Sequence, residues 1–96
     1  MEVDIFGRFQ VRPGAESAME AAIRLVVDAT RVEVDCIGID AFRSTQDGTV
    51  FFIHSRWPNE AAFDLHATLP HTRSFLTAIE PLLTHARDIT RTIRLG

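Results

Sequence analysis

The chain has 96 residues, of which 46% are hydrophobic and 24% charged, and its net charge is −3. This length is typical of one domain over residues 1–96, and the composition is ordinary for a globular protein. Every basic residue is arginine, which excludes catalysis through a lysine Schiff base. No basic cluster indicates nucleic-acid binding. The single cysteine, Cys36, excludes an internal disulfide and a multi-cysteine zinc site.

No apolar run reaches about 18 residues, so we expect no transmembrane helix and no membrane partner. The opening MEVDIFGRF lacks a basic region ahead of an apolar stretch, which argues against a secretory signal. We therefore expect a cytoplasmic protein. A domain this small buries only about two-thirds of its unfolded surface, so a partner chain would add stability.

The first half of the chain predicts a strand, a long helix and a hairpin. Residues 3–11 alternate between apolar and polar, and Pro13-Gly14 ends this strand. Residues 15–32 predict an amphipathic helix. Its expected stripe is Ala18, Ala22, Leu25 and Ala29, widened by Met19, Ile23 and Val26. Two strands, 35–43 and 49–57, flank an Asp-Gly turn in which glycine is expected to supply a positive φ.

The second half predicts a broken helix and a last strand. Pro58-Asn59-Glu60 opens a helix that carries His66, and Pro70 interrupts it because its ring blocks an interior hydrogen bond. The next helical piece has an apolar set and is kinked or ended by Pro81. Its apolar members are Phe75, Leu76, Ile79, Leu82 and Leu83. Residues 88–95 form the final strand.

The order strand, helix, strand, strand, helix, strand predicts an α+β, ferredoxin-like fold with an antiparallel sheet and both helices on one face. The other face is then uncovered, although it carries apolar side chains such as Phe6 and Phe42. A second copy of the chain would bury these apolar side chains, so we expect a homodimer.

Residues 51–83 read FFIHSRWPNEAAFDLHATLPHTRSFLTAIEPLL. The strand-ending Trp57, the E-A-A-F-D-x-H spacing to His66, the Pro70-His71 pair and the F-x-x-x-x-E-P-L-L run resemble the antibiotic biosynthesis monooxygenase family. GRFQVRPG at residues 7–14 and CIGIDAFR at residues 36–43 are similar to its first two strands. The resemblance covers nearly the whole chain and implies a dimeric α+β barrel.

The resemblance implies several activities. The family includes cofactor-independent monooxygenases of phenolic or quinol substrates, heme-degrading enzymes, and an isomerase of a phosphorylated signalling sugar. Heme degraders use an asparagine, a tryptophan and a histidine where this chain has Gly7, His66 and Leu76, so heme cleavage is not expected. Members often carry Tyr-Glu where this chain has His54-Ser55. If that glutamate serves the chemistry or holds the dimer together in the family, this chain uses other residues for that role or lacks it.

The histidines are the candidate catalytic residues. His66 and His71 are five apart with a proline between them, whereas helical zinc ligands need a spacing of four, and no third ligand is evident. We therefore expect no metal. A histidine titrates near neutral pH and can take a phenolic proton, which suits His66 best. His71 is a further candidate, with a helix-shaping role and a backbone hydrogen bond as the alternative. His54 lies in the pocket or the dimer interface.

The predicted substrate-binding residues are Phe9, Ile39, Phe52, Trp57, Phe63 and Phe75, which would form an apolar pocket. We expect Asp40 to pair with Arg8 or Arg56. Cys36 is interpreted as an inert filler, and His85 as solvated.

The leading functional hypothesis is a cofactor-independent monooxygenase that oxidises a small aromatic, quinol or polyketide-like substrate with O2. An isomerase of a small carbonyl compound would use the same histidines without consuming oxygen. A non-catalytic dimer that binds a small ligand or is related to stress is the alternative from another class.

Overall fold

The structure is a computed structural model that describes all 96 residues. Its elements follow the predicted order, with the second helix divided in two. They are β1 (Val3–Gln10), α1 (Glu16–Arg31), β2 (Gly38–Arg43), β3 (Val50–Trp57), α2 (Glu60–Thr68), α3 (Pro70–Ile79), the 3₁₀ turn η1 (Glu80–Leu82) and β4 (Asp88–Thr92). The expected ferredoxin-like α+β fold is confirmed.

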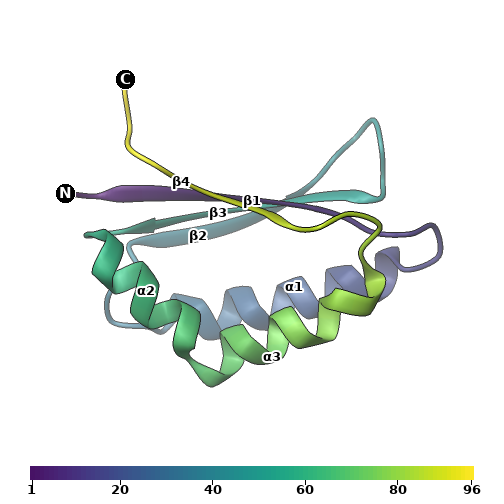
Figure 1. Ribbon diagram of the computed structural model, residues 1–96, viewed down its shortest axis with the longest axis horizontal. Coiled ribbons are helices and arrows are strands. Elements are labelled where there is room, and N and C mark those ends of the chain that lie inside the picture. Colours follow the sequence, from purple (N-terminus) through teal and green to yellow (C-terminus); the bar gives the residue numbers. More distant parts are fainter.

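The four strands form one antiparallel sheet in the order β2-β3-β1-β4. The three helices all lie against one face of this sheet, and the opposite face carries none (Figure 1). None of the helices combines the length and the apolar run that a membrane crossing requires. The chain is therefore built in two layers, and a site between them can be closed from both sides.

The elbow between α2 and α3 is set by local sequence. Asn59 caps α2, its side-chain oxygen accepting from the backbone N–H of Ala62 at 2.9 Å. Leu69 is extended, and Pro70 starts α3, where its missing N–H costs nothing. The two histidines therefore lie on either side of this bend. His66 is in the last turn of α2, and His71 directly follows Pro70 in α3.

The buried face of α1 differs from the predicted stripe. Leu25, expected at its centre, is 74% exposed. The buried side chains are Met19, Ile23 and Val26, which were expected to widen the stripe, together with Val27 and Thr30. The buried face is thus centred on bulkier side chains than the alanine-rich set, and their burial removes more apolar area from water.

Two expected strand boundaries and one expected turn conformation are also corrected. β2 begins at Gly38 because the preceding residues form turns, with the N–H of Cys36 donating to the carbonyl of Glu33. β4 ends at Thr92. The β2–β3 loop contains no residue with positive φ; Ser44 and Asp47 side chains accept from its backbone N–H groups instead.

The core fills the space between the sheet and the helices. Phe9 of β1 and Phe75 of α3 meet edge to face, with ring centroids 5.9 Å apart. Trp57 is fully buried in a smaller cluster at the other end, beneath α2. Its indole N–H donates to Ser55 Oγ at 2.9 Å, which satisfies its one polar atom.

The helix-free sheet face is apolar and uncovered, as predicted. Phe6, Phe42 and Phe52 are 48%, 56% and 39% exposed. His54 stacks on Phe6 with ring centroids 4.5 Å apart, and its Nε2 lies 2.7 Å from a carboxylate oxygen of Asp4. This open face, defined by these five residues, is where the monomer leaves apolar surface exposed.

Within the chain, the partner of Asp40 is neither Arg8 nor Arg56. Asp40 pairs with Arg31 at the end of α1, at 3.3 Å, because the helix brings that guanidinium to the start of β2. Arg56 is 3.0 Å from Glu2 instead.

Candidate functional site

A cavity of about 240 Å³ lies between the sheet and the helices. Most of its lining is apolar, and it draws on β1, β2, β3, β4 and all three helices. Five of the predicted site residues line it: Phe9, Ile39, Phe63, His66 and Phe75. The cavity is small for a ligand site, so it has room only for a small molecule.

Four predicted site residues do not line the cavity: His54, His71, Phe52 and Trp57. His54 and Phe52 lie on the open face, because strand alternation places them opposite Ser55 and Ile53, which line the cavity. Trp57 lies beneath His66, with ring centroids 4.6 Å apart. It supports the imidazole and has no surface in the cavity.

His66 is the one histidine that lines the cavity. Its Nδ1 lies 2.8 Å from Oε2 of Glu33. Because a carboxylate only accepts hydrogen bonds, neutral His66 carries its proton on Nδ1 and donates it to Glu33. Nε2 of His66 makes no hydrogen bond and is not among the fully buried side-chain atoms, and it carries the lone pair of the neutral ring.

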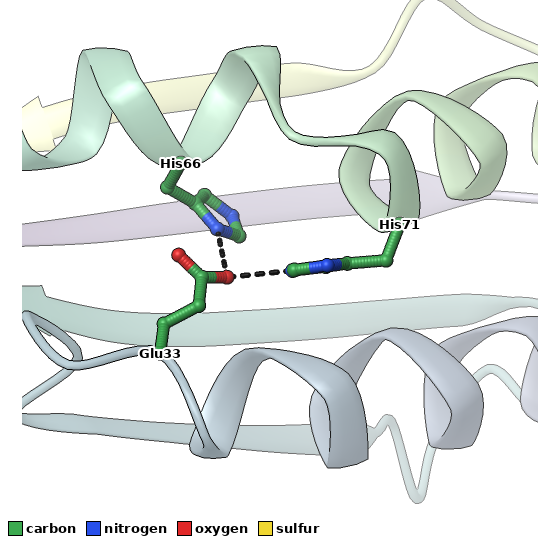
Figure 2. Close-up of side chains that lie close together, drawn as sticks. All are labelled: Glu33, His66 and His71. Carbon is green, nitrogen blue, oxygen red and sulfur yellow. Dashed lines mark hydrogen bonds and ion pairs between the residues drawn. The ribbon is translucent and has the colours of Figure 1, made fainter.

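Glu33 also binds His71, whose Nε2 lies 2.6 Å from the same Oε2 (Figure 2). The expected backbone hydrogen bond of His71 is therefore replaced by a side-chain partner. Glu33 follows α1, and it is 33 and 38 residues away from the two histidines in sequence. Sequence reasoning missed it, and no local pattern around Glu33 signals the contact.

The surroundings of His66 keep it neutral. Burial lowers the pKa of His66 below its ordinary value of 6.5, and this effect outweighs the hydrogen bond and charge of Glu33, which raise it. The charge of nearby His71 lowers it further. Near pH 7 the imidazole can thus accept a proton, and the negative charge of Glu33 would stabilise the imidazolium that this transfer forms.

The cavity has few other polar groups. Thr30 of α1 lines it with its hydroxyl unpartnered, and Arg87 lies along it while paired to Glu80 at 3.3 Å. Outside the cavity, burial raises the pKa of the Cys36 thiol, which keeps this side chain unreactive, as interpreted from the sequence. His85 is exposed, as expected.

Gly7 and Leu76 line the same cavity as His66. These are the three positions at which heme degraders of the resembling family carry other residues. A side chain at Gly7 has little room, because an added Cβ would lie 3.0 Å from the Phe9 ring.

Comparisons with known proteins agree with this geometry. Residues 5–78 match the family model described as antibiotic biosynthesis monooxygenase. The chain belongs to this family. It is 31% identical over 88 residues to the Mycobacterium tuberculosis protein named "Putative monooxygenase Rv0793", covering 92% of this chain and 86% of that protein.

Solved structures of similar length show the same fold. The Rv0793 structure superposes with a TM-score of 0.93 at 28% identity, covering 100% of this chain and 97% of that one. PA3566 from Pseudomonas aeruginosa superposes with a TM-score of 0.91 at 25% identity, covering 99% and 95%. The predicted family is thereby confirmed, and a monooxygenase type of function is its general expectation.

Proposed function

We propose that this antibiotic biosynthesis monooxygenase family member oxidises a small phenolic or quinol-like aromatic compound with O2, without a cofactor. One observation carries the proposal: His66 is a buried, neutral imidazole that lines an apolar cavity, and Glu33 holds its Nδ1 at 2.8 Å while Nε2 makes no hydrogen bond. This is the arrangement of a general base with an orienting carboxylate.

The chemistry begins with a proton. A phenol ionises near pH 10 in water, so it needs a base to ionise at neutral pH. His66 Nε2 takes the hydroxyl proton, and the resulting aryloxide is electron-rich enough to give one electron to O2. The superoxide and aryloxyl radical then combine, which forms a carbon–oxygen bond.

The atoms balance without an added reductant. The substrate loses two hydrogens, one from its hydroxyl group and one from the oxidised ring carbon, and gains one oxygen as a quinone carbonyl. The second oxygen leaves as water, which carries both hydrogens. His66 returns its proton to the departing oxygen, so the protein is unchanged at the end.

The walls of the cavity suit an aromatic ring better than a phosphorylated sugar. Phe9 and Phe75 meet edge to face, and Ile39 contributes a further apolar wall. An apolar lining also excludes water, which would otherwise solvate the aryloxide and the radical pair.

We also propose that the protein acts as a homodimer through its open face. A monomer that exposes Phe6, Phe42 and Phe52 together leaves an apolar patch that a second copy would bury. The stacked His54 and its partner Asp4 would then lie at this interface and take no part in the chemistry.

Oxygen consumption by the metal-free protein tests the function. With naphthol or anthrone as substrate, we expect one O2 consumed per quinone formed. His66→Ala should lower the rate at least about a hundredfold, while the exposed control His85→Ala should leave it within about twofold. Equal rates in the wild type and His66→Ala would overturn the role of His66, and consumption of no O2 with any phenol would favour the proton-transferring isomerase.

A further inference from the structure

Three side chains from separate elements converge behind the cavity. Glu33 follows α1, His66 lies in the last turn of α2 and His71 in the first turn of α3, and all three point toward one another (Figure 2). Their donor atoms all lie within 4.8 Å of one another. We propose that Glu33, His66 and His71 form a binding site for a divalent transition-metal ion of the Zn²⁺ class.

The ligand set fits this class of ion. Two imidazole nitrogens and one carboxylate oxygen bind Zn²⁺ in many proteins, with water as the fourth ligand. No thiolate is present and only one ligand is a carboxylate, so the set suits Zn²⁺ or Co²⁺ better than Ca²⁺ or Mg²⁺, which prefer oxygen ligands. The charge of Glu33 offsets half of the charge of the ion.

The present distances are close to those that an ion requires. Glu33 Oε2 lies 2.8 Å from His66 Nδ1 and 2.6 Å from His71 Nε2. Ligands of a tetrahedral zinc ion are about 3.3 Å apart. Withdrawal of the carboxylate by less than an ångström would therefore let one cation replace the two hydrogens that now bridge it to the imidazoles.

The site is protected but reachable. The side chains of His66 and Glu33 are 9% and 13% exposed, whereas that of His71 is 29% exposed. An ion can thus enter from the side of His71, where a water ligand also has access. Because Glu33 and His71 do not line the cavity, the ion would sit on the outer side of His66, away from the substrate.

An ion at this position would affect the reaction of the cavity, an effect that rests on the proposed function. A metal ion on Nδ1 of His66 leaves the ring proton on Nε2. Nε2 then cannot accept a proton from the substrate. Bound zinc should therefore inhibit oxygenation, by about tenfold when free zinc is ten times its dissociation constant.

Metal binding is tested first without any substrate. The full chain, free of affinity tag and treated with chelator, is titrated with Co²⁺, whose visible absorption strengthens in a tetrahedral site, and with Zn²⁺ by calorimetry. We expect one ion per chain and a rise of about 10 °C in the thermal midpoint at a hundredfold excess over the dissociation constant.

Matched variants locate the ion. Glu33→Gln keeps the size of the side chain but removes the charge, and His71→Ala removes an imidazole; each should weaken binding at least about tenfold. The control His85→Ala removes an exposed histidine outside the cluster and should bind as the wild type does. Absence of a one-to-one complex, or equal affinity in His71→Ala, would overturn the site.

Oxygen uptake then separates the two proposals. If zinc binds one-to-one and inhibits, both the metal site and the role of His66 are supported. If zinc binds but uptake is unchanged, the metal site stands and the role of Nε2 as base is wrong. If no ion binds while uptake depends on His66, the metal site is wrong and the proposed function stands.

Discussion

Replacement of Glu33 by glutamine tests how the carboxylate assists His66. Glutamine keeps an acceptor oxygen for Nδ1, so the orientation of the ring is largely preserved, but the negative charge is lost. A hydrogen bond to a charged partner contributes about 1.5–3 kcal/mol, against about 1 kcal/mol for a neutral one. The imidazolium formed during proton transfer should thus lose about 1–2 kcal/mol, which lowers kcat about 5- to 30-fold.

The pH profile gives a second, independent signature. His66 is active when neutral, so activity is present above its pKa and is lost as the pH falls through it. Burial holds this pKa below 6.5, and Glu33 raises it through a hydrogen bond and its charge. Glu33→Gln removes the charge, so the acidic limb of kcat should move to lower pH.

The assay is the rate of oxygen uptake by the metal-free protein with naphthol, measured as a function of pH. Asp28→Asn is the matched control, because it removes one negative charge from an exposed position of α1. The reasoning is refuted if Glu33→Gln retains a kcat within twofold of the wild type and its acidic limb stays in place.

Three further perturbations test the fold, the cavity and the assembly. Trp57→Ala removes a fully buried ring and should lower the free energy of unfolding in urea by about 3–5 kcal/mol; a loss below about 1 kcal/mol would contradict its core position. Gly7→Ala places a Cβ 3.0 Å from the Phe9 ring, so KM for naphthol should rise, and an unchanged KM would argue against binding there. Phe52→Asp should give a monomer mass in light scattering while the exposed control Leu65→Asp stays dimeric; a dimer in both would exclude the open face.

Much of the fold follows from local sequence rules. The period-2 strands and the break at Pro70 depend on neighbouring residues alone. The break is found where it was expected, and all four strands are present, although β2 begins later and β4 ends earlier than expected. Met19, Ile23 and Val26 are buried as expected, but the centre of the α1 stripe was misplaced, because only packing against the sheet decides that Leu25 is exposed.

The candidate site was only partly predictable for a similar reason. His66 was identified because an imidazole on an apolar helix face needs a partner or a cavity. Glu33 was missed because its contact spans 33 residues and leaves no periodic signal. His54 could not be assigned a side because both faces of β3 are apolar: Phe51 packs in the core, and Phe52 lies on the open face.

The central claim is that His66 takes the phenolic proton of the substrate, and the most direct measurement is made without oxygen. Naphthol is bound anaerobically to the metal-free protein, and the absorbance of its aryloxide is followed with pH. The account predicts that bound naphthol ionises well below its solution pKa in the wild type and not in His66→Ala. Equal ionisation in both proteins would contradict it.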